Sequence, residues 1–286
     1  MTTTNSGEDL KRRLTIMVDS MPAFPESVCR IIEITTDINC SPKDLVKVIE
    51  RDPVMTMKIL KMVNSAFFAL SRNVSSVQHA LVYLGLNTVK NLAVSVATID
   101  ALPRQSIPEL KMSDFLTHSL ATASVAQWLA KNKLHIRDAS DHFVAGLLHD
   151  FGKAVFIQFE PATYGKLIRE AKEKGLPLKL VEMEHLGISS AEVGAMLAES
   201  WKLPEQLVNC IRTQLDCNKD SSDLTLTVAA ASTVVKAMQL GDNGDPYVGD
   251  FSEIMSRRLE CTLEDVVAQM QGLPDEVGRL ISAVRG

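Results

Sequence analysis

The chain has 286 residues, of which 46% are hydrophobic and 23% charged, a composition typical of a globular protein with a substantial core. A formal net charge of −5 gives no overall basic field that would attract nucleic acid or an anionic membrane. No stretch of about 18 apolar residues predicts a membrane span, and residues 2–7 are too polar for a signal peptide. We therefore expect a cytoplasmic protein that binds neither nucleic acid nor membranes.

The cysteines support the same location. They have no CxxC pair and no metal-ligand spacing, which fits reduced thiols in a cytoplasm. The five are Cys29, Cys40, Cys210, Cys217 and Cys261.

Signals for helix starts recur along the first hundred residues. Residues 41–44, Ser-Pro-Lys-Asp, predict an N-cap followed by a proline at the first helical position. Residues 52–53, Asp-Pro, predict another start, and Gly85 separates two further helices. The helix after Pro53 carries an apolar face: Met55, Ile59, Met62 and Val63. Its methionines Met55, Met57 and Met62 are expected in the core, although such a helix also suits an adaptable partner surface.

The rest of the chain continues this helical pattern. Ser113 is expected to cap a helix, residues 189–192 read as a capping box for a helix reaching Trp201, and Thr262 starts another helix. Alternating strand patterns are weak. The sequence predicts an all-α fold of about a dozen helices of ordinary length.

Two breaks suggest a division of the chain. Residues 102–108 contain two prolines, and residues 241–246 form a polar loop before a final pair of helices. We expect an N-terminal helical bundle over residues 14–105, packed on a multi-helix core over residues 110–240. Residues 241–286 are expected to form a C-terminal helical extension.

His118 and the adjacent pair His149–Asp150 are the strongest candidates for a functional site. His118 falls on the apolar stripe of its helix and should point inward, either as a hydrogen-bonded core histidine or as a metal ligand. Asp150 continues an apolar stripe of a helix from Asp141, so it needs a cation, a metal or several donors. Lys153, three residues on, supplies one cation. Spacing leaves a buried polar cluster and a metal site as open alternatives.

These residues, in this order, resemble the HD phosphohydrolase superfamily, and further motifs resemble its HDOD family, a bacterial signalling module related to HD-GYP phosphodiesterases. The match runs in order over roughly residues 20–240. The matching segments are 21–25, 45–49, 52–53, 60–66, 80–85, 118–119, 149–153 and 201–204. The resemblance implies an HD-like helical core.

The resemblance also implies that the metal site is degenerate. Active relatives have a histidine where this chain has Ser190, a His-His pair near Gln214 and Leu215, and a late aspartate near Ser232. Serine and glutamine are poor metal ligands beside imidazole and carboxylate. His118, His149, Asp150 and Lys153 remain, so no metal cofactor is expected.

Other residues could act as replacement ligands. His142 lies seven residues before His149, and Glu184 and His185 precede the Ser189 cap. Surface positions are the simpler interpretation, because a refilled site also needs groups that orient each ligand. If the site is refilled, His118, His149 and Asp150 would bind Fe, Mn or Zn.

Three functions follow from the sequence. The first is a non-catalytic signal-transduction output or adaptor module that binds other signalling proteins. The second is a residual metal-dependent phosphohydrolase acting on a nucleotide or cyclic dinucleotide. The third is a nucleotide sensor without hydrolysis, for which the chain shows no phosphate-binding motif.

Overall fold

The computed structural model describes residues 4–36, 41–65, 68, 70 and 72–285, except for the side chains of residues 4–9, 11, 284 and 285. Cys40 and Ala66 lie outside the described residues. Every regular element in this part of the chain is a helix, apart from an isolated bridge between Ile107 and Leu110. The predicted all-α fold is confirmed. No helix in the described ranges is long and apolar enough to cross a membrane.

Most helices follow one another through short connections, and the longer ones join α4 to α5, α6 to α7 and α14 to α15. Their bounds are α1 Thr4–Asp19, α2 Glu26–Thr36, α3 Pro42–Glu50, α4 Pro53–Val63, α5 Val77–Leu84, α6 Leu86–Asp100, α7 Met112–Asn132, α8 Ser140–Leu148, α9 Phe151–Phe159, α10 Pro161–Lys174, α11 Leu178–Leu186, α12 Ser190–Ser200, α13 Glu205–Thr213, η2 Gln214–Asp216, α14 Asp223–Ala237, α15 Glu253–Leu259, α16 Leu263–Gln269 and α17 Leu273–Arg285.

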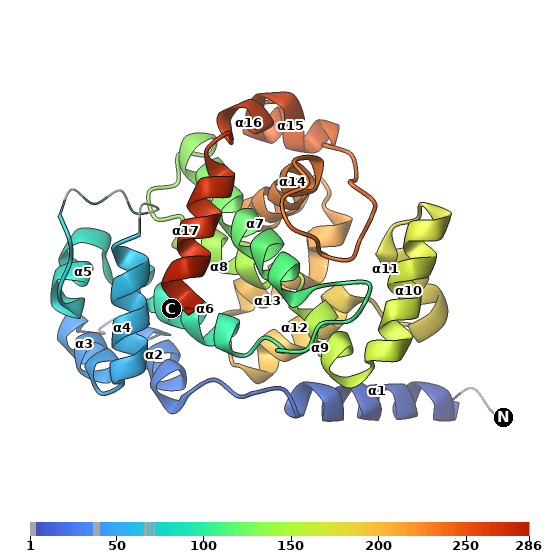
Figure 1. Ribbon diagram of the computed structural model, residues 1–286, viewed down its shortest axis with the longest axis horizontal. Coiled ribbons are helices and arrows are strands. Elements are labelled where there is room, and N and C mark those ends of the chain that lie inside the picture. The colour runs from blue at the N-terminus through green and yellow to red at the C-terminus, as the bar shows by residue number, and fades with distance from the viewer. Residues whose placement is uncertain (1–3, 37–40, 66–67, 69, 71, 286) are drawn as a thin grey trace.

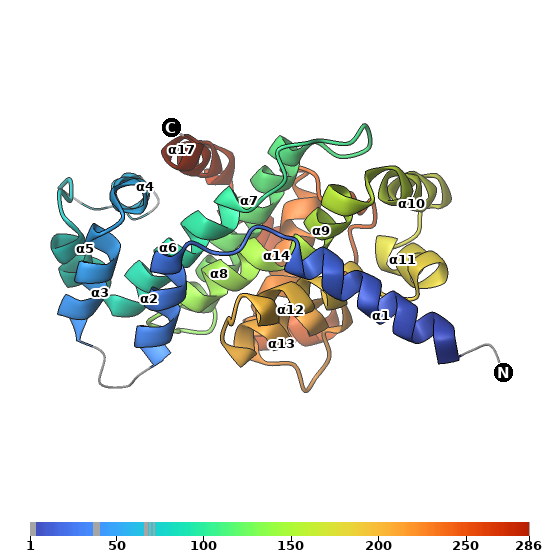
Figure 2. The same ribbon diagram turned by 90° about the horizontal axis from the view of Figure 1, so that it is seen from below.

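The helices form an elongated arrangement with α7, α8 and α14 at its centre (Figure 1). Helices α2 to α6 gather at one end, and α10 and α11 lie at the other (Figure 2). The two terminal helices pack against helices that are distant from them in the sequence. Helix α1 runs beneath the centre and packs against α12 and α9, whereas α17 returns to pack against α7 and α4. The predicted boundaries at residues 105 and 240 stay predictions.

Helix α7 is buried on nearly every side because its sequence is rich in alanine, serine and threonine. Small side chains allow its neighbours to approach closely. A Cβ added to Gly146 of α8 would lie 2.7 Å from Ala123 Cα of α7, so only glycine allows this crossing. The close packing of α7 and α8 brings His118 next to the end of α8.

Several predicted caps are present. The side chain of Ser41 accepts a hydrogen bond from the backbone N–H of Lys43, and that of Asp52 accepts one from Met55. Ser189 caps α12, and Thr262 forms a reciprocal capping box with Asp265. These caps depend only on residues within the first turn, so they form regardless of which helices lie next to them.

Other expectations were wrong in detail. Helix α7 begins at Met112 without a side-chain cap, so Ser113 is not its N-cap. Helix α8 ends at Leu148, and His149 and Asp150 form the turn before α9 instead of extending a helix. Such breaks explain why the described residues contain more than a dozen helices, with three instead of two after residue 246. Met55 and Met62 are buried as expected, but Met57 is exposed.

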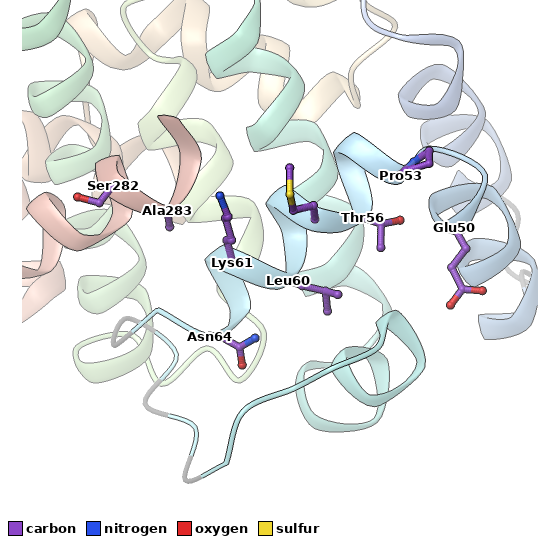
Figure 3. Close-up of a pocket in the computed structure, with 9 residues that line it drawn as sticks. Glu50, Pro53, Thr56, Leu60, Lys61, Asn64, Ser282 and Ala283 are labelled. Carbon is purple, nitrogen blue, oxygen red and sulfur yellow. The ribbon is translucent and has the colours of Figure 1, made fainter. Parts of the chain in front are cut away.

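The return of α17 creates a surface groove of about 800 Å³ beside α4. Ser282 and Ala283 of α17 form one side, and residues of α4 including Lys61 form the other (Figure 3). The C-terminal extension therefore reaches the N-terminal group of helices as well as the central helices.

Replacing Gly152 by alanine tests the crossing of α9 and α12. The new Cβ would lie 1.8 Å from the carbonyl oxygen of Ser190 and 2.6 Å from the Gly194 nitrogen, and neither backbone atom can move freely. We expect Gly152→Ala to lower the free energy of unfolding by about 2 kcal/mol or more, measured by urea denaturation.

Gly278→Ala is the matched control. Gly278 lies in α17, and its added Cβ meets no atom within 4 Å. Alanine should raise helix stability there by up to about 1 kcal/mol. Equal effects of the two substitutions would contradict the tight crossing.

Candidate functional site

The candidate site is a buried group of polar side chains, here called the Asp150 cluster: His118, His149, Asp150, Lys153 and Asn243. His118 lies in α7, Lys153 in the first turn of α9, and His149 and Asp150 in the turn that joins α8 to α9. Each of these four residues is between 1% and 3% exposed. The structure thus brings together all four residues that the sequence singled out.

Asp150 is the centre of this cluster. Its Oδ1 lies 3.0 Å from Lys153 Nζ, and its Oδ2 accepts a hydrogen bond of 2.7 Å from Asn243 Nδ2. His149 Nε2 lies 3.1 Å and His118 Nε2 lies 3.9 Å from Oδ2. The carboxylate therefore has a cation on one oxygen and an amide donor on the other.

Asn243 was missed at the sequence level. It lies in the loop 241–246, which the sequence identified only as a polar break. Gly241 anchors this loop on α7: it has a φ of +76°, and an added Cβ would lie 2.4 Å from the backbone nitrogen of His118. The Asp242 N–H also donates to the Asp114 carbonyl, at 3.1 Å. The two glycines that flank Asn243, Gly241 and Gly244, were the signal available in the sequence, and both adopt positive φ in the structure.

The hydrogen bond of His149 Nδ1 determines which ring nitrogen faces the Asp150 cluster. Nδ1 lies 2.8 Å from the Gly146 carbonyl, which can only accept, so Nδ1 carries a proton. Nε2 is buried and has no hydrogen-bond partner among the described residues. Its 3.1 Å separation from Asp150 is a close approach without hydrogen-bond alignment. In the neutral tautomer, Nε2 presents a lone pair to the cluster.

The charges within the cluster shift the pKa values of its members. Burial acts to raise the pKa of Asp150, but the charges of His149 and Lys153 outweigh it and hold the pKa well below the ordinary value. Burial acts to lower the pKa of Lys153, but Asp150 and other nearby carboxylates raise it. Burial lowers the pKa of His118 well below its ordinary value, and the charge of His149 adds to this effect. The cluster therefore holds an ionised Asp150–Lys153 pair beside a neutral His118.

Ser190 occupies the first position that departs from the active pattern, and it is part of a different hydrogen-bond network. Glu182 Oε2 accepts from the Ser190 N–H at 2.8 Å and from its hydroxyl at 3.1 Å. Glu182 Oε1 accepts from the Tyr164 hydroxyl at 2.6 Å. Burial raises the pKa of Glu182, although these hydrogen bonds oppose the shift. Ser190 thus holds α12 against α11 and α10.

The other departing positions share a cavity. Gln214, Leu215 and Ser232 line a space of about 350 Å³ together with Lys236 and Asp245. Lys236 Nζ donates to Asp245 Oδ2 at 2.6 Å and to the Tyr247 carbonyl at 3.0 Å. The Gln214 Nε2 group is buried without a hydrogen-bond partner among the described residues. The structure therefore gathers these sequence positions on one side of the site, where they present amide, alkyl and hydroxyl groups.

The donor set fits one metal ion and no more. Ligand atoms from His118, His149 and Asp150 lie within 4.8 Å of one another, and the contact of His149 Nδ1 with the Gly146 carbonyl leaves Nε2 as the nitrogen directed toward the other ligands. Three protein ligands are the minimum for a catalytic ion. A second ion would need the imidazole and carboxylate groups that Ser190, Gln214 and Ser232 do not provide.

The possible replacement ligands lie elsewhere. His142 is buried, but its Nδ1 lies 2.7 Å from the hydroxyl of Thr227. Glu184 and His185 are exposed on α11, where His185 Nε2 pairs with Glu170 at 3.0 Å. A buried hydrogen bond accounts for His142 and a surface ion pair for His185, and none of the three residues joins the ligand atoms of the Asp150 cluster.

Comparison with known proteins identifies the family. A family model described as the HDOD domain matches residues 21–217, which is more than half of the chain. The chain belongs to the HDOD family. The match spans both the N-terminal helices and the Asp150 cluster except for Asn243.

Several solved structures share the fold. A Shewanella amazonensis protein with a provisional phosphohydrolase designation is 26% identical, with a TM-score of 0.73 over 94% of this chain and 97% of the other. An HDOD domain protein of unknown function from Geobacter sulfurreducens is 24% identical, with a TM-score of 0.77 over 96% and 97%. A Marinobacter aquaeolei protein with a provisional signal transduction designation is 25% identical, with a TM-score of 0.72 over 93% of this chain and 59% of that chain.

An uncharacterized protein of Treponema pallidum is 28% identical over 233 residues, which represent 80% of this chain. The match covers 44% of that protein, so the chain corresponds to less than half of this relative.

Removing the Asp150 carboxylate should destabilise the fold because it leaves Lys153 buried without its anionic partner. We expect Asp150→Ala to lower the free energy of unfolding by about 3 kcal/mol or more. The double variant Asp150→Ala/Lys153→Met should lose less than Asp150→Ala alone, because it removes both charges. Chemical denaturation of all three proteins measures these values. A loss below about 0.5 kcal/mol in Asp150→Ala would contradict the buried pair.

The raised pKa of Glu182 predicts a pH dependence. A carboxyl group whose pKa is higher in the folded than in the unfolded state makes stability fall as pH rises through that higher pKa. Glu182→Gln carries a pH-independent cost, because its amide faces the Ser190 donors. The stability difference between wild type and Glu182→Gln should therefore shrink as pH rises above the ordinary glutamate value of 4.5. A difference that grows with pH would show instead that the folded state favours the carboxylate.

Proposed function

We propose that this protein is a non-catalytic signal-transduction module that acts by binding other signalling proteins. One observation carries the proposal: Asp150 has its partners from the protein alone, with Lys153 on one oxygen and Asn243 on the other. A buried carboxylate that is already paired and hydrogen-bonded needs no metal ion to offset its charge. The pair supports a structural role for this part of the site.

The departing positions support the same proposal. Ser190 is held by Glu182, which also holds Tyr164, so this corner of the former site links three helices through hydrogen bonds. On the other side, Lys236 is partly buried, and its pKa is lowered first by burial and further by the charge of Lys153, with Asp245 opposing. A second divalent cation would add positive charge beside two lysines. The electrostatics disfavour a two-metal centre.

Family membership supports the signalling role. The chain contains an HDOD domain, and a structure similar over 93% of the chain has a provisional signal transduction designation. The described residues contain no nucleophile–base arrangement that would replace metal chemistry in the cluster, because its members are two histidines, one paired acid, a lysine and an amide. An output module of this kind would transmit its state through its surface.

A residual metal-dependent phosphohydrolase is the second candidate, favoured by the free Nε2 of His149 and the three converging ligand atoms. His118, His149 and Asp150 would hold the ion, and a bound ion would supply Lewis-acid polarisation and an activated water. Asp150 would first have to exchange the hydrogen bond from Asn243 for the ion. Solved relatives with a provisional phosphohydrolase designation share the fold.

Metal content separates the two candidates. Untagged protein purified without chelators should contain less than about a tenth of an equivalent of iron, manganese or zinc, because three ligands around a paired carboxylate bind weakly. The same protein should not hydrolyse a generic phosphodiester in the presence of Mn²⁺ or Fe²⁺. Inductively coupled plasma mass spectrometry and a chromogenic phosphodiester assay measure the two properties.

Two variants control this experiment. Asp150→Ala removes a candidate ligand, whereas Asp220→Ala removes an exposed carboxylate elsewhere. Stoichiometric metal and hydrolysis that disappear in Asp150→Ala and persist in Asp220→Ala would overturn the non-catalytic proposal.

A further inference from the structure

A surface groove of about 740 Å³ lies between α3 and α5, away from the Asp150 cluster. Val46 and Leu81 contribute to its lining, together with Val82 and Leu86. Lys43 and Lys47 stand on the α3 side. The groove lies within the residues matched by the HDOD model.

The apolar part of this groove is exposed to a degree that packing within the chain does not explain. Val82 is 80% exposed, and the neighbouring Tyr83 is 62% exposed. Isolated apolar side chains are common on protein surfaces, but Val82 also lines a concave, largely apolar groove. Such a surface is typical of a site that another molecule covers.

The walls of the groove determine which peptide conformation can bind. Both walls are α-helices, whose backbone groups are paired within each helix. An extended peptide would find no free sheet edge here, whereas an amphipathic helix can place an apolar stripe between the two walls. The groove therefore favours a helix over a strand.

The charges at the rim determine the polarity of that helix. Lys43 and Lys47 are exposed and lie one turn apart on α3, although the whole chain has a net charge of −5. Lys47 Nζ pairs with Asp44 Oδ1 at 3.2 Å, but both side chains are exposed. Such surface pairs contribute little free energy, so Lys47 can exchange this partner for an acidic residue of a bound helix. Glu50, at the end of α3, lines this groove and also the groove beside α4. Acidic residues would meet the two lysines, and a basic residue would meet Glu50.

We propose that the α3–α5 groove binds an amphipathic helix of a partner protein, with acidic residues flanking its apolar stripe. This inference rests on the proposed signalling function and names the surface that would serve it. The helix would lie with its acidic part along Lys43 and Lys47 and its apolar stripe against Val82 and Leu81.

A display library of helix-biased peptides, selected on the whole chain, tests this chemistry while the partner is unidentified. Selected peptides should share an apolar stripe at helical spacing and a net negative charge. Fluorescence anisotropy then measures their affinity for variants. Val82→Lys should weaken binding at least about tenfold, and Lys43→Glu/Lys47→Glu should weaken it about tenfold while improving binding of a charge-reversed peptide.

Met183→Lys and Lys219→Glu are matched controls. Met183 is 47% exposed on α11, and Lys219 is an exposed lysine far from α3 in the sequence. Both should leave affinity within about twofold of wild type. Unchanged far-UV circular dichroism and melting temperature in Val82→Lys would show that the loss concerns the surface and not the fold.

Three outcomes would overturn the proposal: no selected binders, binders that are basic or extended, or binders insensitive to Val82→Lys. Self-association in light scattering that Val82→Lys abolishes would also overturn it, because the occupant would then be a second copy of the chain. These variants should leave metal content and phosphodiester hydrolysis unchanged, because the groove lining contains no residue of the Asp150 cluster. Failure of the groove proposal and failure of the non-catalytic proposal therefore remain distinguishable.

Discussion

The burial of Asp150 is the constraint on which the central part of the structure depends. An ionised carboxylate that is 3% exposed requires partners, and these come from two parts of the chain: Lys153 from α9 and Asn243 from the loop after α14. Meeting this requirement joins the 241–246 loop to the turn between α8 and α9. The small residues of α7 and Gly146 make the requirement achievable because they let the helices approach closely enough.

The same constraint explains how a fold can persist while its chemistry changes. Metal ions normally offset the charge of buried acids and hold the surrounding helices together. Here Lys153 offsets the charge of Asp150, and Asn243 donates a hydrogen bond to it. Glu182 accepts hydrogen bonds from Ser190 and Tyr164. In the proposed function, these side-chain interactions within the chain would take over the structural part of the role of a metal without reproducing its Lewis acidity. That division is the physical basis of the proposed non-catalytic function.

The proposed non-catalytic module would act through its surface. The N-terminal helices, which lie at one end of the elongated arrangement, carry the exposed apolar side chains Val82, Tyr83 and Met57. Helix α17 connects this end to α7, the helix that holds His118. The helices at the centre and the helices that form the surface grooves are therefore in direct contact through α17.

The sequence by itself determined the helical class, the caps at Ser41, Asp52, Ser189 and Thr262, and the inward direction of His118, because these depend on residues within one or two turns. It also indicated the pairing of Asp150 with Lys153, three residues apart. It did not reveal Asn243, which is 93 residues from Asp150 in the chain, or the Glu182–Ser190–Tyr164 network. It placed Asp150 in a helix that ends at Leu148. Only the tertiary structure decided these features, because long-range contacts set the partners of a buried polar group and local periodicity does not.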